Sequence, residues 1–382
     1  MSSNPTSPRL RGTKRILIFS LAYHPVVGGA EVAIKEITDR ISDIEFDVVT
    51  LRFSKEYPNE EKIGNCMVYR IGGGLGYLSK IIFVPQAAFF ASKKKYDAYW
   101  VIMTNMLFPV VLLRLFGNRT PYILTLQDGD PFEYVFERMR IKMFLPLLKY
   151  GFRHATKVQT ISNFLAEWTR KMGYKGKMEI IPNGVDMKRF QPPLARTVLA
   201  KSSIVLITTS RLVKKNGVGD IIGALKYLPE HIKLKILGAG PLEENLKFKI
   251  KNLKLEDRVE FLGHVSHYDI SKYLHEADIF VRPSLSEGMG ISFIEAMVAG
   301  LPVITTPVGG IVDFLRDGET GLFCEVRNPE SIAVQVKKLM DNDKLRENIV
   351  KNARKMVEEK YDWDLIAKRM KEKIFDLPAT GR

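Results

Sequence analysis

The sequence predicts an α/β protein built from two doubly wound, Rossmann-like domains that face each other across a cleft. At 382 residues the chain is too long for one ordinary core and suits two domains of about 180 residues each. Short β-rich apolar runs alternate with longer helix-like patterns, which is typical of parallel βα units. A cluster of turn formers and helix breakers, Pro182-Asn183-Gly184 followed by Pro192-Pro193, separates two such series.

The alternation can be assigned strand by strand. The first series is expected at residues 15–20, 46–51, 67–71, 99–103, 122–126 and 158–161, and the second at 204–209, 233–237, 259–262, 279–282 and 303–306. We therefore expect a flexible tail over residues 1–12, a first domain over 13–195 and a second domain over 196–362. Since ligands of such sheets bind beyond the carboxyl ends of the strands, the reactive groups should come from loops that follow strands.

The net charge of +15 indicates an anionic partner, such as a nucleic acid, an anionic lipid or a phosphorylated substrate. Nucleic acid is disfavoured because the sequence has no zinc-ligand spacing, arginine-rich arm or RNA-binding motif. Cys66 and Cys324 have no metal-type spacing, and neither a signal peptide nor a membrane-spanning run is apparent. These features predict a cytoplasmic protein, either soluble or peripheral on the inner face of the cytoplasmic membrane.

A glycine pair, Gly28 and Gly29, follows the first expected strand and precedes an amphipathic pattern. Glycines let the backbone approach a ligand closely, and the start of the following helix would offer free N–H groups to an anion. A plain tight turn explains the same pair equally well, so the pair by itself leaves both interpretations open.

Basic residues follow the first strand of the second series, at Arg211, Lys214 and Lys215. A guanidinium and an ammonium at this place could hold a nucleotide diphosphate and neutralise charge on a departing phosphate. A solvated basic turn is the alternative. The next strand is followed by Gly238-Ala239-Gly240-Pro241, in which Gly240 offers a further point of close approach.

The segment from Pro283 to Met297 carries the most information. It follows a strand, and its apolar spacing predicts a helix that starts near residue 289. The unpaired N–H groups of this helix should face the cleft, namely those of Gly288, Met289, Gly290 and Ile291. Glu287 could accept hydrogen bonds from sugar hydroxyls, and Glu295 from ribose hydroxyls. The alternatives are an ordinary loop carboxylate and a surface helix charge.

The pattern Pro-Ser-x-x-Glu-Gly-x-Gly-x-x-x-x-Glu-Ala-Met in this segment resembles retaining glycosyltransferases of the GT-B fold, specifically glycosyltransferase family 4. The resemblance covers nearly the whole chain. It extends, in the family order, to the segments 28–31, 181–186, 210–213, 238–241 and 306–310.

The resemblance implies transfer of a hexosyl unit from a UDP- or GDP-linked sugar to a glycan or lipid-linked acceptor, with retention of anomeric configuration. It implies that Arg211 and a following lysine hold the diphosphate, Glu295 takes the ribose and Glu287 contacts the transferred sugar. The backbone around Val265 would face the base. The loop of Gly28 and Gly29 would close over the phosphates or accept part of the acceptor.

Two departures from the family pattern bear on the mechanism. The family lysine usually lies five residues after the arginine, where this sequence has Asn216, so Lys215 is the preferred substitute over Lys214. A histidine common near the reacting sugar is replaced by Gln127, which can donate a hydrogen bond but cannot act as an acid or base. We therefore expect catalysis to depend on positioning and on stabilisation of the leaving diphosphate by Arg211 and Lys215.

Asp128-Gly129-Asp130 mimics the Asp-x-Asp of metal-dependent glycosyltransferases. In this sequence it lies in the first domain, in the position of an acceptor-side loop. We therefore assign Gln127 and Asp128 to the acceptor side, and we predict no metal and no other cofactor. The family resemblance also implies that a C-terminal helix, residues 363–382, crosses back to the first domain and braces the hinge.

Two stretches of the first domain mix cations with apolar residues. One runs from Tyr134 to Lys157, and in the other Lys93-Lys94-Lys95 follows the apolar stretch from Ile81 to Phe90. Such mixtures suit a helix that lies on an anionic membrane surface, which would favour a lipid-linked acceptor. The alternative is an amphipathic helix that packs on its own sheet and exposes a basic face to solvent.

Three other functions fit the same fold. A GT-B sugar-nucleotide epimerase would need an acid and a base at the sugar, and a phosphorylase of the pyridoxal type would need a cofactor-binding lysine; neither can be identified. A catalytically silent nucleotide-sugar-binding scaffold subunit is disfavoured because it has no need of Arg211, Glu287 and Glu295 together.

Overall fold

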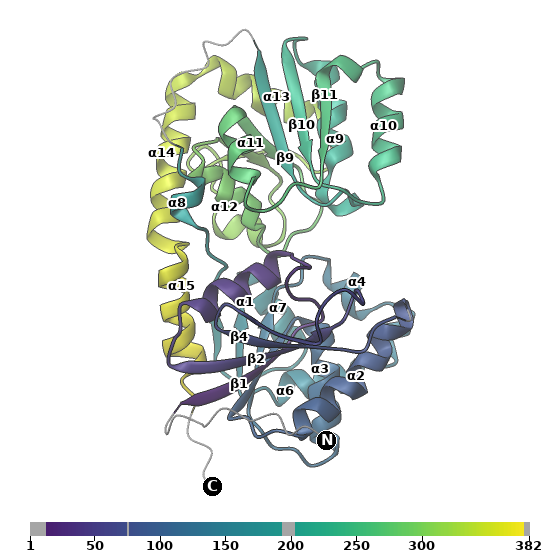
Figure 1. Ribbon diagram of the computed structural model, residues 1–382. Coiled ribbons are helices and arrows are strands. Elements are labelled where there is room, and N and C mark those ends of the chain that lie inside the picture. Colours follow the sequence, from purple (N-terminus) through teal and green to yellow (C-terminus); the bar gives the residue numbers. More distant parts are fainter. Residues whose placement is uncertain (1–12, 75, 193–202, 378–382) are drawn as a thin grey trace.

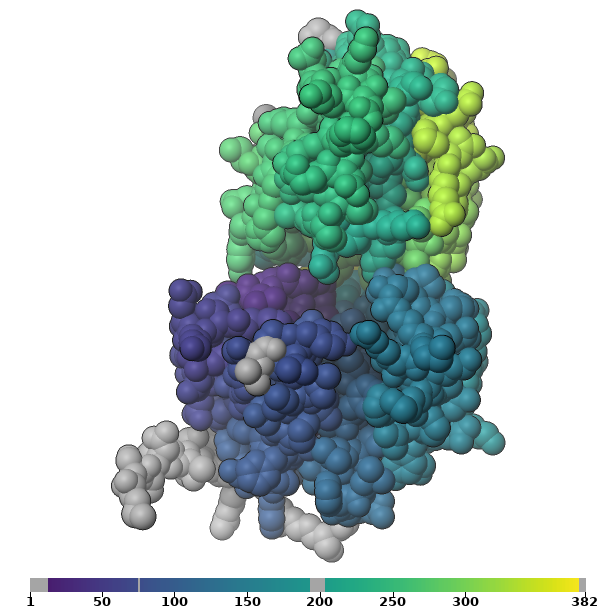
Figure 2. All heavy atoms as spheres, turned by 90° about the vertical axis from the view of Figure 1, so that its right-hand side faces the viewer, coloured from purple at the N-terminus to yellow at the C-terminus, as the bar shows by residue number. Residues whose placement is uncertain are grey.

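The computed structural model describes residues 13–74, 76–192 and 203–377. The expected tail and the expected domain boundary near residue 195 lie outside these residues. The described chain forms two lobes, each built around one sheet, and the second lobe rests on the first (Figures 1 and 2). The predicted α/β class and each predicted strand are confirmed.

The first sheet has the order β3-β4-β2-β1-β5-β6-β7-β8. All of its pairs are parallel except the antiparallel pair of β3 with β4. The strands are Lys14–Phe19 (β1), Ile44–Leu51 (β2), Glu60–Ile63 (β3), Cys66–Ile71 (β4), Ala98–Ile102 (β5), Tyr122–Leu126 (β6), Lys157–Thr160 (β7) and Met178–Ile180 (β8).

The second sheet is entirely parallel, with the order β11-β10-β9-β12-β13-β14. Its strands are Ile204–Thr209 (β9), Ile232–Leu237 (β10), Val259–Gly263 (β11), Ile279–Arg282 (β12), Val303–Thr305 (β13) and Leu322–Phe323 (β14). The strand order reverses between β1 and β5 in the first sheet and between β9 and β12 in the second. Ligands of doubly wound sheets bind at such reversals, so the two reversals locate the expected site.

The helices of the first lobe are Gly29–Asp39 (α1), Tyr77–Ser92 (α2), Leu107–Leu115 (α3), Phe132–Phe136 (α4), Met139–Lys142 (α5), Leu145–Arg153 (α6) and Asn163–Lys171 (α7). Met187–Phe190 (α8) follows the connection between the sheets. The second lobe contains Val218–Ala224 (α9), Glu243–Asn252 (α10), Ile270–Glu276 (α11), Ile291–Val298 (α12), Pro329–Asp341 (α13) and Asp343–Lys360 (α14), and Trp363–Arg369 (α15) comes last.

The chain crosses between the lobes twice, and the two crossings lie side by side. Val185 forms a parallel bridge with Asp362, and its backbone N–H donates to the carbonyl of Tyr361 over 2.7 Å. A Cβ at Gly184 would lie 2.7 Å from the Trp363 ring, so only glycine fits this approach. Beyond the crossing, α15 and the π-helical turn Met370–Phe375 pack on the first sheet (Figure 1).

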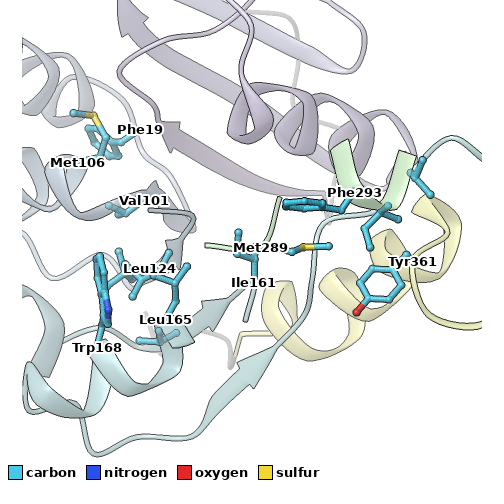
Figure 3. Packing of buried hydrophobic residues seen from close by; sticks show 14 of the residues in the cluster. Phe19, Val101, Met106, Leu124, Ile161, Leu165, Trp168, Met289, Phe293 and Tyr361 are labelled. Carbon is cyan, nitrogen blue, oxygen red and sulfur yellow. The ribbon is translucent and has the colours of Figure 1, made fainter. Parts of the chain in front are cut away.

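A continuous apolar cluster joins the lobes. Met289 and Phe293 of the second lobe share it with Ile161 of the first lobe and Tyr361 of the second crossing (Figure 3). Met289 is only 3% exposed and Phe293 is fully buried. Removal of such side chains from water stabilises the contact between the lobes, which brings their carboxyl edges together.

The structure differs from the sequence prediction at the sheet edges and in one helical region. The strands β3, β8 and β14 were not predicted; all are edge strands, and β3 is charged while β8 and β14 are very short. The amphipathic stretch 134–157 is three short helices, α4 to α6, rather than one. The chain turns extended at Arg138, and Pro146 lies in the first turn of α6, where a proline ring fits but cannot continue an earlier helix.

Candidate active site

The loops that follow β9 and β12 meet the loop that follows β6 of the other lobe. The Ser286 hydroxyl donates to the carbonyl of Gly129 over 3.1 Å, which joins the segment after β12 to the acceptor-side loop. A Cβ at Gly288 would lie 2.3 Å from the carbonyl oxygen of Asp128. The predicted donor segment and the predicted acceptor-side loop are therefore in direct contact.

The backbone of Glu287 also contacts the glycine pair Gly309 and Gly310, which follows β13. Gly310 N–H donates to the carbonyl of Glu287 over 2.9 Å. Gly309 has φ 57°, and a Cβ there would lie 1.9 Å from the same carbonyl oxygen. Only glycine fits at this place, so the Thr306–Gly310 segment holds the Glu287 loop in position rather than leaving it mobile.

The Glu287 carboxylate is bound by a buried arginine that the sequence reasoning missed. Arg282, the last residue of β12, forms an ion pair with Glu287, donates to the Ser292 hydroxyl over 2.7 Å and lies 4.1 Å from the centre of the Phe293 ring. Burial lowers the pKa of this guanidinium, and the coulombic attraction of Glu287 opposes that shift. The other Glu287 oxygen accepts from the N–H of Gly288 over 3.0 Å.

The helix N-terminus in this segment begins at Ile291, two residues after the expected start at Met289. Gly290 is the preceding residue and has φ 86°, a conformation that glycine adopts without strain. The side chains of Met289 and Ile291 pack against clusters that include residues of the first lobe. Contact between the lobes therefore involves the same residues whose N–H groups were predicted to face the donor.

Lys215 reaches across to the acceptor-side loop. Its Nζ lies 3.1 Å from Asp130 Oδ1, and a Cβ at Gly129 would lie 3.0 Å from this Nζ. Asn216 is buried and donates from its side chain to the carbonyl of Arg211 over 2.6 Å. Of the two, Lys215 presents a cation at the junction of the lobes, whereas Asn216 supports the backbone of Arg211, whose own side chain is exposed.

The loop of Gly240 supports the Arg211 loop from behind. Leu212 N–H donates to the carbonyl of Ala239 over 3.0 Å, and a Cβ at Gly240 would lie 2.5 Å from the carbonyl oxygen of Leu212. A Cβ at Gly238 would likewise lie 1.9 Å from the carbonyl oxygen of Ser210. The two glycines thus have a packing reason that requires no ligand.

Gly28 and Gly29 are exposed at the start of α1. Gly28 N–H donates to Glu31 over 2.8 Å, as in a capping box, and burial raises the pKa of the Glu31 carboxyl. A Cβ at Gly29 would meet nothing within 4 Å. The space in front of Gly29 is therefore open to a ligand, unlike the space at Gly240, Gly288 and Gly309 of the second lobe.

Glu295 lies in the second turn of α12 and is 3% exposed. Its Oε1 lies 2.6 Å from Nε2 of His267, which follows β11 four residues after the end of the strand. His267 was not singled out in the sequence, although Val265 of the same loop was; Val265 is partly buried against the apolar cluster that joins the lobes.

The acceptor-side residues Gln127 and Asp128 both have protein partners. Gln127 Oε1 accepts from the side chain of Asn183 over 2.9 Å. Asp128 is buried and accepts from the Thr104 hydroxyl over 3.2 Å, and burial raises the pKa of its carboxyl to about 6. Across the described parts of the chain, no three His, Cys, Asp or Glu side chains cluster as metal ligands would.

Two cavities bear on the assignment of ligands. One of about 190 Å³ lies between the lobes, where Phe132, Phe164 and Trp168 face the segments 285–286 and 308–309. Another, of about 930 Å³, lies at the amino ends of β7 and β8. The second is larger, but ligands of doubly wound sheets bind at the carboxyl edge, so we assign the substrates to the junction of the lobes.

Two facing Rossmann-like lobes, with a basic loop and a glutamate-bearing loop at the strand-order reversal of the second sheet, define a protein of the GT-B type, and the family models identify it as a glycosyltransferase. Family models agree over most of the chain: "Glycosyltransferase Family 4" matches residues 27–189 and "Glycosyl transferases group 1" matches residues 194–356. The chain belongs to the group 1 glycosyltransferase family.

Individual relatives and structures match along almost the full length. An uncharacterized glycosyltransferase of Methanocaldococcus jannaschii is 29% identical, over 93% of this chain and 96% of its own. Sucrose-phosphate synthase from Thermosynechococcus elongatus has the same fold, with a TM-score of 0.82, 20% identity and coverage of 94% of this chain and 98% of its own. Anabaena HepE, solved with UDP-glucose, gives a TM-score of 0.77 at 20% identity and covers 95% and 100%.

Proposed function

We propose that the protein is a retaining hexosyltransferase that uses a UDP- or GDP-linked sugar and requires neither a metal nor another cofactor. The observation that carries this proposal is the meeting of Lys215, the Glu287 loop and the acceptor-side loop at the junction of the lobes. The structure of HepE with UDP-glucose, a neighbour of the same fold, supports a UDP-linked donor.

In the proposed reaction, the bond between the anomeric carbon and the diphosphate breaks, and a bond to the acceptor oxygen forms on the same face. Arg211 and Lys215 stabilise the negative charge that develops on the diphosphate. Gln127 cannot take the acceptor proton, and in this proposal the proton passes to the departing phosphate. Glu287, oriented by Arg282, accepts hydrogen bonds from the sugar hydroxyls.

A thermal-shift screen of UDP-, GDP- and ADP-linked sugars tests the donor, because a ligand that binds only the folded protein raises the melting temperature. We expect one UDP- or GDP-sugar to raise it, and we expect slow hydrolysis of that sugar without acceptor. Stabilisation without hydrolysis or transfer would identify a silent binding subunit instead. Loss of activity in excess EDTA would overturn the metal-independent mechanism, and an inverted product anomer would overturn retention.

The acceptor proposal depends on the outer surface of the first lobe. The start of α2 follows β4 at the carboxyl edge, on the face that Figure 2 turns toward the viewer, and its apolar side chains are unusually exposed. The exposed fractions are 69% for Tyr77, 58% for Leu78 and 57% for Ile81, and further along they are 88% for Met139 and 73% for Met143. Exposed cations lie among them, at Lys80, Arg138, Arg140 and Lys142.

We propose that this surface binds an anionic membrane peripherally and that the acceptor is lipid-linked. No helix in the described part of the chain is both long and apolar enough to span a bilayer. Flotation with anionic vesicles should recover the protein, and Ile81→Ser with Met139→Ser should weaken recovery. Val334→Ser, at an apolar side chain of the second lobe that is 55% exposed, is the matched control. Equal recovery on neutral vesicles would contradict the proposal.

A further inference from the structure

Glu295 is the first of three side chains joined by polar contacts that run from the donor side of the second lobe to α8. Its Oε1 lies 2.6 Å from His267 Nε2, and Nδ1 of the same ring lies 3.2 Å from Nη1 of Arg189. Arg189 belongs to α8, directly after the first crossing between the lobes. The contacts therefore connect a predicted ribose ligand to the connector.

The chemistry of the three side chains determines where the imidazole proton lies. A guanidinium has donors and no acceptor, so Arg189 donates and Nδ1 of His267 accepts. The proton of the neutral ring is then on Nε2, where it donates to Glu295 Oε1. This bond uses one carboxylate oxygen and fixes the direction of the other.

Arg189 is itself held in place on two sides. It forms an ion pair with Asp186 over 3.2 Å, and its guanidinium lies 4.8 Å from the centre of the Tyr268 ring. The next residue, Phe190, is buried, and its carbonyl lies 2.9 Å from Nε2 of His275 on α11. The connector helix α8 is thus fastened to the second lobe beside the Glu295 carboxylate.

We propose that His267 and Arg189 are positioning residues for recognition of the donor ribose. Arg189 sets the tautomer of His267, and His267 orients Glu295 so that its Oε2 accepts from a ribose hydroxyl. Because α8 continues from the crossing at Val185, these contacts also link the ribose ligand to the connector. The inference rests on the proposed donor function and adds two residues to it, neither of which touches the reacting atoms.

The test measures dissociation constants by calorimetry for UDP, GDP and ADP and for their 2′- and 3′-deoxy forms. His267→Leu should weaken the preferred nucleotide about tenfold, the scale of one lost hydrogen bond to a charged group. It should also reduce the preference for ribose over the deoxy forms. His267→Gln, whose amide can donate in place of Nε2, should restore both to within about threefold.

Arg189→Met should give an intermediate loss, because the ring keeps its donor but loses the partner that fixes its tautomer. His231→Gln, at an exposed histidine of the same lobe, is the matched control and should change neither quantity. An unchanged ribose preference in folded His267→Leu would overturn the inference while leaving the donor function intact. Binding of none of the nucleotides to the natural protein would overturn the donor function and the inference together.

Discussion

The two sides of the cleft differ in how their functional residues are assembled. On the donor side, Arg211, Glu287 and Glu295 lie in two short stretches that follow neighbouring strands of one sheet. On the acceptor side, the loop of Gln127 and Asp128 depends on partners from distant segments, such as Asn183 and Thr104. The donor-side residues themselves therefore lie close together along the chain, although Glu295 also takes a partner, His267, from another loop. Gln127 and Asp128 of the acceptor side take their partners from segments far away in the sequence.

The largest expected effect is on the donor side, at the exposed cation of the β9 loop. Arg211→Ala removes a guanidinium assigned to the leaving diphosphate, and we expect kcat to fall about 100- to 1000-fold at saturating donor. Arg316→Ala, at an arginine of the same lobe whose side chain is 77% exposed, is the control. Near-full turnover by Arg211→Ala would show that the Arg211 guanidinium does not stabilise the leaving diphosphate.

The ion pair between Arg282 and Glu287 gives the next effect, which is on stability. Glu287→Gln leaves the buried Arg282 guanidinium without its carboxylate, and removal of one partner of a buried pair costs about 3 to 5 kcal/mol of unfolding free energy. Urea denaturation measures this loss. The exposed pair of Arg316 and Glu319 is the matched control, since Glu319→Gln should cost less than about 1 kcal/mol. Equal losses of unfolding free energy in Glu287→Gln and Glu319→Gln would mean that the Glu287 carboxylate is as exposed to solvent as that of Glu319.

These residues also show what the sequence could and could not predict. The strand and loop pattern predicted the fold and the placement of Lys215, because βα units repeat and ligands bind at carboxyl edges. Arg282 looked like the end of an apolar strand, and His267 like a residue of an ordinary loop. Their roles depend on partners 5 and 28 residues away that only the packed structure brings together.

On the acceptor side, the buried Asp128 carboxyl should make the stability of the protein depend on pH. Burial raises the pKa of Asp128 to about 6, above the ordinary value of an aspartate, so the folded state binds the proton more tightly than the unfolded state. The associated stability is present below about pH 4 and is lost as the pH rises through about 6.

Asp128→Asn should therefore be more stable than the natural protein at pH 7.5, by about 2 to 3 kcal/mol, with the difference vanishing near pH 4. Thermal and urea unfolding across this range measure the difference. Glu137→Gln, at an exposed carboxylate of the same lobe, is the control. A constant difference at all pH values would mean that the Asp128 carboxyl does not titrate in this window.

The smallest effect concerns the contact where the two sides meet. Asp130 holds Lys215, whose side chain is 31% exposed, over 3.1 Å, and a diphosphate would compete for the same ammonium. Asp130→Asn should therefore tighten donor binding about threefold at low ionic strength and less at high salt, because exposed pairs are weak and screened. Glu137→Gln, at an exposed carboxylate of the same lobe, controls for the change in net charge. Weaker donor binding by Asp130→Asn would instead mean that the pair helps the lobes to close, so that the acceptor-side loop assists donor binding rather than competing with it.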